Sequence, residues 1–177
     1  QIRLFAIQRS GSTYLEYLLS SNYDFSVVGR DKSEKHCCYD EIVVKEPAIH
    51  LVRNPYAWAE AFHRFRHHFT WYDETRTFEE SVEMYADIYN KMNSGWAINC
   101  DATIRYESLT QSPENICSAL ANKFHAKQTS KEWIDTDQRL HMRLCTKGDY
   151  GLFDKTAQNK GSHFSVFSRK DFQNFTY

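Results

Sequence analysis

Glycine and proline are scarce in this sequence, with six glycines and three prolines among 177 residues. No stretch rich in Gly, Ser or Pro interrupts the chain, and no segment is repeated, which argues against flexible linkers and repeat architectures. We therefore expect a single domain spanning residues 1–177. Because glycine and proline are so few, each one is informative about where the backbone turns.

The chain also lacks a long apolar run and a surplus of charge. None of its hydrophobic stretches is long enough to cross a bilayer, so we expect no membrane span. The formal net charge is −1 at pH 7, whereas a general nucleic-acid-binding protein would carry a basic surplus. No hydrophobic leader precedes the first expected strand, which favours a cytoplasmic location.

The five cysteines do not form an obvious disulfide framework. Their number is odd, and Cys37 and Cys38 are adjacent, which makes a simple pairing unfavourable. Reduced thiols in a cytoplasmic protein are the better interpretation. His36 precedes the two cysteines, but the CxxC and HxxxH spacings typical of metal sites are absent, so we expect no metal.

Short apolar runs alternate with segments of helical periodicity. The runs that predict buried strands lie at residues 2–7, 25–28, 42–44, 49–52 and 102–106. Helices are predicted at residues 13–20 and 56–68, and from Thr77, Ser112 and Ser168 onward. This alternation predicts a three-layer α/β/α fold with a central, mostly parallel sheet. The strand, tight loop and helix at the start of the chain are P-loop-like.

Two helix starts have clear signals. Thr77 is followed three residues later by Glu80, which predicts a capping box. Pro113 follows Ser112 and is suited to the first helical position, where its missing N–H has no cost. These two signals fix where the later helices should begin.

The segment between the first strand and the first helix has the composition of an anion-binding loop. Arg9 supplies a permanent charge, Gly11 allows a close backbone approach, and Ser10, Ser12 and Thr13 add hydroxyl groups. Backbone N–H groups and the dipole at the helix start would favour an anion. No Lys precedes Ser12 or Thr13, so the Walker A motif is absent and an ATP or GTP hydrolase is disfavoured. The alternative is an ordinary helix cap formed by Ser or Thr.

A second candidate anion ligand follows the strand at residues 49–52. Arg53 stands at its end, and Asn54 and Pro55 then open a helix. We expect this Arg to emerge at the strand tip and to bind an anion bidentately. Ligands of parallel α/β sheets bind at the carboxyl ends of the strands, where Arg9 also lies. Two anion sites for one ligand predict a nucleotide with phosphate at both ends.

Three segments together, RSGST, VRNP and IRYESL, resemble the sulfotransferases that use 3′-phosphoadenosine 5′-phosphosulfate (PAPS). Their order and location match and span most of the chain. The resemblance implies that Arg9–Thr13 hold the 5′-phosphosulfate and that Arg53 binds the 3′-phosphate. It also implies that Tyr106 lies against the nucleotide near that phosphate.

The family also has a basic glycine loop near the C-terminus that closes over the 3′-phosphate. Lys160, Gly161 and Ser162 are the best candidates for this loop, and the Lys147–Gly148 pair is the runner-up. Neither segment is a clean match.

The sequence departs from the family pattern in three places. Ala61 stands where a serine usually binds the 3′-phosphate, a loss of about 1 kcal/mol unless another group, such as Arg64, replaces it. Lys45 and Glu46 come only a few residues before Arg53, so this is a compact version. Pro47 stands where a catalytic histidine is common.

The resemblance and the positions of the residues relative to the expected strands indicate the candidate catalytic groups. Arg9 is expected to stabilise the leaving phosphate. Glu46, at a strand tip facing the first loop, is the first candidate for the base, as glutamate is in some glycan-modifying members. An ion pair with Lys45 or an Arg is the alternative for Glu46. His36 is the second candidate base, and His50, inside a buried strand, is expected to be structural.

The sequence therefore predicts a transferase that moves a sulfuryl group from PAPS to an acceptor hydroxyl, on a glycan or a small molecule, and releases 3′,5′-adenosine bisphosphate (PAP). The expected partners are the nucleotide and the hydroxyl acceptor, with no nucleic acid. One alternative is a non-catalytic module that binds PAP or PAPS. Another is a P-loop kinase with an atypical loop, which would need Mg²⁺ ligands.

Overall fold

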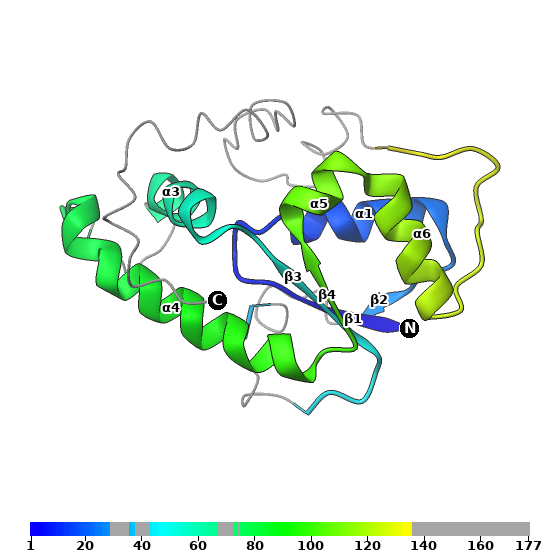
Figure 1. Ribbon diagram of the computed structural model, residues 1–177, viewed down its shortest axis with the longest axis horizontal. Coiled ribbons are helices and arrows are strands. Elements are labelled where there is room, and N and C mark those ends of the chain that lie inside the picture. Colours follow the sequence, from blue (N-terminus) through cyan, green and yellow to red (C-terminus); the bar gives the residue numbers. More distant parts are fainter. Residues whose placement is uncertain (29–35, 38–42, 67–72, 74, 136–177) are drawn as a thin grey trace.

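The computed structural model describes residues 1–28, 36–37, 43–66, 73 and 75–135 (Figure 1). Its strands are β1 (Ile2–Phe5), β2 (Val27–Val28), β3 (Ala48–Val52) and β4 (Ala102–Arg105). Its helices are α1 (Ser12–Asn22), α3 (Pro55–Phe65), α4 (Phe78–Asn99), α5 (Tyr106–Gln111) and α6 (Pro113–Lys123). The strands form one parallel sheet in the order β2-β1-β3-β4, so the predicted parallel α/β fold is confirmed.

The two faces of the sheet bury different side chains, which gives the molecule three layers. Ile49 and Leu51 of β3 pack in one core cluster with Leu18 of α1, and α6 contributes to the same cluster. Val52 packs in another cluster with Trp58 of α3, together with aromatic side chains of α4. The separation follows because successive residues of a strand point to opposite faces. Figure 1 shows α1 and α6 on one side of the sheet and the long α4 on the other.

The chain order of the strands creates a switch point between β1 and β3. From β1 the chain crosses through α1 to β2 on one flank, and β3 then pairs with the opposite flank of β1. The loops that leave β1 and β3 therefore lead to helices on opposite faces of the sheet, α1 on one and α3 on the other. The carboxyl ends of the strands at such a switch point are where ligands bind in open parallel sheets.

The helix starts follow the signals in the sequence. Thr77 and Glu80 form the predicted capping box of α4, and Pro113 occupies the start of α6. Asn54 caps α3, because its side-chain oxygen accepts hydrogen bonds from Tyr56 N and Ala57 N at 3.0 and 3.3 Å. No helix in the described ranges is both long enough and apolar enough to cross a membrane.

The strand predicted at residues 42–44 is wrong for the two residues that the structure describes. Val43 and Val44 lie outside any strand, and Val43 is 81% exposed. Both flanks of β1 are occupied by β2 and β3, and β3 is flanked by β1 and β4, so the segment before β3 has no place beside either central strand. Val44 packs instead against the cluster formed by Phe5, Ala48 and Trp96.

Candidate functional site

The loop after β1 has two residues in the left-handed region. Arg9 has a φ of 70° and Gly11 a φ of 87°. For a residue with a side chain this conformation costs roughly 1–2 kcal/mol, so other contacts must hold Arg9 in it. At Gly11 a side chain is also excluded by space, because a Cβ atom there would overlap the ring of Tyr106. Only glycine fits this position without a shift of the loop or of the ring.

The loop ends at a helix start that no side chain caps. Gly11 is the N-cap residue of α1, and its carbonyl accepts from Tyr14 N and Leu15 N at 3.0 and 3.2 Å. The alternative prediction, an ordinary cap formed by Ser or Thr, is therefore wrong. The Ser10 hydroxyl is buried, with 1% of the residue exposed, and has no hydrogen-bond partner among the described residues. An uncapped helix start beside an unpaired buried hydroxyl is suited to an anion.

Arg53 does not emerge at the strand tip as predicted but is buried, with 7% of the residue exposed. Its Nη1 donates a hydrogen bond of 2.8 Å to the carbonyl oxygen of Arg9, so the two arginine loops meet. Its guanidinium lies over the ring of Tyr106, 5.1 Å from the centroid. Burial lowers the pKa of Arg53, while the neighbouring Tyr106 and Glu107 oppose this shift.

The segment around Arg53 is fixed by two groups that sequence reasoning missed. The Tyr89 hydroxyl, from α4, donates to the Arg53 carbonyl at 2.6 Å. The backbone N–H of Asn54 donates to Glu107 Oε1 at 2.9 Å. Glu107 belongs to the IRYESL segment and was within reach of sequence reasoning, whereas nothing distinguishes Tyr89 from the other aromatic residues of its helix.

The exposed side chain of Arg9 lies against α3. Its guanidinium carbon is 4.4 Å from the centroid of the Phe65 ring, a cation–π distance worth about 0.5–1 kcal/mol at an exposed site. Trp58 Nε1 donates to the carbonyl of Gln8 at 2.8 Å, one residue earlier in the same loop. The loop therefore packs on α3, and it keeps one permanent positive charge at the surface.

Tyr106 is the first residue of α5 and lies between the two loops. Only 3% of it is exposed, and burial raises its pKa to about 12 despite the opposing charges of Arg53 and Arg9. On one side its ring occupies the position that a Cβ atom on residue 11 would take. On another side the ring faces the Arg53 guanidinium. The role implied for Tyr106 against a nucleotide stays a prediction.

The structure separates the two candidate bases. His36 lies at the carboxyl end of β1, where its Nδ1 hydrogen-bonds to the Ala6 carbonyl. Glu46 lies at the opposite end of the parallel strands, their amino end, because it precedes β3 and pairs with Arg3 at the start of β1 (Nε to Oε2, 3.3 Å). The predicted position of Glu46, facing the first loop, is therefore wrong, and the alternative ion pair with an Arg is confirmed. The reason is that no strand ends at Glu46; the residue leads into β3 instead.

The pKa of Glu46 is consistent with this structural role. A hydrogen bond from its own backbone N–H is the main cause that lowers the pKa of the carboxyl group. The positive charge of Arg3 acts in the same direction. Hydrogen bonds and a positive neighbour favour the charged form of a carboxyl group.

The remaining predicted residues fall in three groups. Ala61 is half-buried on α3, and Arg64 forms an ion pair with the buried Glu60. His50 is fully buried in β3 and hydrogen-bonds to Asn93 Oδ1 at 2.9 Å, as expected for a structural residue. The candidates for the C-terminal glycine loop lie outside the described residues; they are Lys160, Gly161 and Ser162, with Lys147 and Gly148 as runner-up. Among the residues that the structure describes, no cluster of three potential metal ligands is present.

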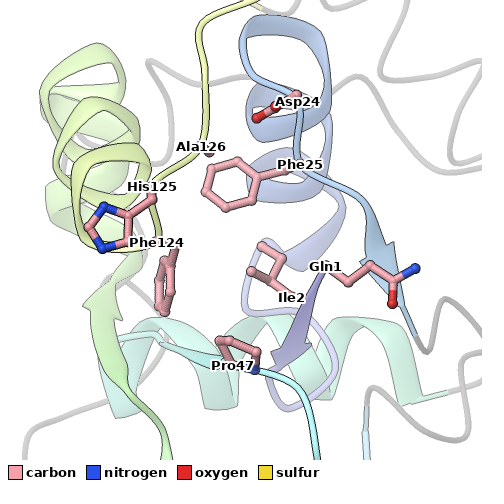
Figure 2. A pocket seen from close by; sticks show the side chains of 8 residues that line it. All are labelled: Gln1, Ile2, Asp24, Phe25, Pro47, Phe124, His125 and Ala126. Atoms are coloured by element: carbon pink, nitrogen blue, oxygen red, sulfur yellow. The ribbon is translucent and has the colours of Figure 1, made fainter.

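A hollow of about 190 Å³ lies away from these loops (Figure 2). It opens at the amino end of the sheet, beside Ile2 and Pro47. Phe25 and Phe124 meet in it edge to face, with ring centroids 6.4 Å apart. None of the lining residues belongs to the loops after β1 and β3, so the candidate site and this hollow are separate features.

The contacts around the candidate site thus join segments from three strand ends. Comparison with known proteins adds no assignment to it. No protein-family model matches the chain, and no curated protein matches it.

Proposed function

We propose that this chain is a PAPS-dependent sulfotransferase that moves a sulfuryl group from PAPS to an acceptor hydroxyl and releases PAP. The observation that carries the proposal is the hydrogen bond from Arg53 to the Arg9 carbonyl at the switch point of the sheet. It brings together two of the segments, RSGST and VRNP, on which the sequence resemblance depends. Tyr106 of the third segment packs against both.

The residues of the first loop fit a phosphate group. The uncapped start of α1 offers backbone N–H groups and the positive end of the helix dipole. The unpaired Ser10 hydroxyl is a buried donor of the kind that a bound anion would satisfy. Arg9 adds a positive charge at the surface of the same loop. Bound PAPS would supply an activated sulfuryl group on a good phosphate leaving group.

The chain's own contribution to the reaction would be positioning and charge stabilisation. Arg9 and the N–H groups of α1 would neutralise the charge that grows on the leaving phosphate. Arg53 uses one N–H on the Arg9 carbonyl, and its guanidinium has five in all, which leaves others for the 3′-phosphate. This second role of Arg53 comes from the sequence resemblance.

His36 replaces Glu46 as our candidate for the base. A carbonyl oxygen only accepts hydrogen bonds, so the contact with Ala6 requires Nδ1 to carry the proton. In the neutral ring that tautomer leaves the lone pair on Nε2, the form that accepts a proton from an acceptor hydroxyl. His36 also lies at the carboxyl end of the strands, as does the loop formed by Arg9–Thr13, which we call the anion loop. Glu46 lies at the other end.

A non-catalytic nucleotide-binding module is the second candidate function. The position of Glu46 at the amino end of the strands and the proline at position 47, where a catalytic histidine is common, both remove groups that a transferase would use. A P-loop kinase is less well supported. β3 is followed by Arg53 and β4 ends in Arg105, so neither strand end has an aspartate suited to Mg²⁺.

Calorimetry with PAP and with ATP, followed by an assay of labelled sulfate transfer from PAPS to a panel of glycans and small alcohols, tests the proposal. We expect PAP to bind more tightly than ATP, and transfer to at least one class of hydroxyl. Tight binding of ATP without binding of PAP would refute the proposal. Binding of PAP without transfer to any acceptor would instead favour the non-catalytic module.

A further inference from the structure

Four residues at the switch point form a closed set of contacts, which we call the loop interlock: Arg9, Gly11, Arg53 and Tyr106. Arg53 donates to the Arg9 carbonyl, and its guanidinium lies over the Tyr106 ring. That ring in turn occupies the space where a side chain on Gly11 would stand. The contacts therefore return to the loop in which they begin.

The loop interlock acts on the most constrained part of the anion loop. Arg9 has a left-handed backbone that residues with side chains rarely adopt. Such conformations persist only where surrounding contacts over-determine them. The hydrogen bond from Arg53 is a charge-assisted contact to this very peptide, and it fixes the direction of the Arg9 carbonyl.

Arg53 is itself rigidly held, so it can serve as an anchor. Tyr89 donates to its carbonyl, and the next backbone N–H donates to Glu107. Its burial also shows that much of the guanidinium surface faces protein. An arginine whose main task was to reach a phosphate at the rim would be more exposed.

We propose that Arg53 is a positioning residue, which holds the Arg9–Gly11 backbone in its anion-binding form. It is then needed for the 5′-phosphate that this loop would hold as well as for the 3′-phosphate. This inference rests on the proposed nucleotide site and refines it. A residue that contacted the 3′-phosphate alone would matter only for ligands that carry that group.

Two nucleotides separate these roles in the full chain: PAP, which has the 3′-phosphate, and adenosine 5′-monophosphate (AMP), which lacks it. We expect Arg53→Gln to weaken the binding of both by roughly tenfold to a hundredfold, as for a lost hydrogen bond to a charged group. Arg53→Lys, which keeps charge and reach, should restore part of the binding of both. The control is Arg76→Gln, at an exposed position before α4, which should leave both affinities unchanged.

Amide hydrogen exchange of the ligand-free protein gives a second readout, which needs no nucleotide. We expect faster exchange at residues 10–13 in Arg53→Gln, partial recovery in Arg53→Lys, and no change in Arg76→Gln. A loss of affinity confined to PAP, with unchanged exchange, would overturn the inference and leave the proposed function standing. If the unaltered protein binds neither nucleotide, it is the proposed function that fails, and with it the nucleotide role of Arg53.

Discussion

Ser10 is a single residue that supports the proposed ligand site. Buried polar groups in proteins are nearly always paired, yet this hydroxyl has no partner among the described residues. Leaving such a group unpaired costs about 1–3 kcal/mol. Violations of this kind are expected at functional sites, where stability is given up for binding.

This leads to a prediction for Ser10→Ala. Removing the hydroxyl should leave the free energy of unfolding unchanged or raise it by up to about 1 kcal/mol, because an unpaired group disappears. The same change should weaken PAP binding roughly fivefold to tenfold, since the bound phosphate loses a donor. Chemical denaturation and calorimetry measure the two effects.

Ser81→Ala is the matched control for this experiment. Ser81 is also a buried serine, but its hydroxyl donates to the Thr77 carbonyl at 2.7 Å. Its removal should lower the free energy of unfolding by about 1 kcal/mol and leave PAP binding unaffected. Equal destabilisation by the two substitutions would show that Ser10 is an ordinary structural residue.

At the residue scale the sequence predicted which residues meet at the switch point better than how they are arranged there. Arg9, Gly11 and Arg53 were found because their residue types and their positions after strands suit anions. The burial of Arg53 was not foreseen, because it depends on Tyr89 and Tyr106, which come from segments far along the chain. Local pattern carries no information about such partners.

The contact between α3 and α4 contains a titratable hydrogen bond. His63 Nδ1 and the Tyr85 hydroxyl are 2.6 Å apart. Burial lowers the pKa of His63 to about 4, and the nearby charge of Arg66 acts in the same direction. The neutral ring therefore belongs to the packed state of these two helices.

Stability should consequently fall as the pH is lowered through this range. The folded pKa of His63, about 4, is below the ordinary value of 6.5, so the unfolded chain binds more protons between these values. The contribution is complete above pH 6.5 and is lost as the pH falls toward 4. Because His63 is only half-buried, solvent screens its charge, and we expect the loss in the free energy of unfolding to be about 1 kcal/mol. Denaturation midpoints at pH 7.5 and 5.0 should differ less in His63→Gln than in the unaltered protein; identical pH dependence would contradict the assignment.

The elements themselves were predictable where a local signal decides. The capping box of α4 and the proline of α6 act within one helical turn, so the sequence contains all the information. The apolar run at residues 42–44 is different, because a strand forms only where its backbone pairs with a neighbouring strand, and Val44 packs its side chain elsewhere instead. That condition is set by the whole sheet, and the misplacement of Glu46 followed from the same error.

At the scale of the molecule, one buried side chain fastens the last described segment to α1. Asn22 is fully buried; its Oδ1 accepts from Ile134 N and its Nδ2 donates to Ile134 O, both at 2.7 Å. The Asn22 carbonyl also accepts from Thr129 N at 2.9 Å. Near the other end of the helix, the Tyr14 hydroxyl donates to Asp135 Oδ1 at 3.1 Å. The segment after α6 is thus held along α1, the helix that begins at the anion loop.

We predict that Asn22→Leu lowers the free energy of unfolding by about 2–3 kcal/mol, because it removes the hydrogen bonds that the buried Asn22 side chain makes to the backbone of Ile134. Trypsin should also cleave after Lys131 faster than in the unaltered protein. Asn122→Ala, at an exposed position of α6, is the control and should change the free energy by less than about 0.5 kcal/mol. Unchanged cleavage in Asn22→Leu would mean that other contacts hold the segment.

The loop interlock has a consequence for the order of events during synthesis. Arg53 comes 44 residues after Arg9, and Tyr106 follows much later in the chain. A nascent polypeptide that has not yet released Tyr106 from the ribosome has the RSGST motif and Arg53, but it lacks the ring that completes the loop interlock. Competence for anion capture should therefore appear abruptly, once Tyr106 has emerged, and not build up gradually as the preceding residues are added.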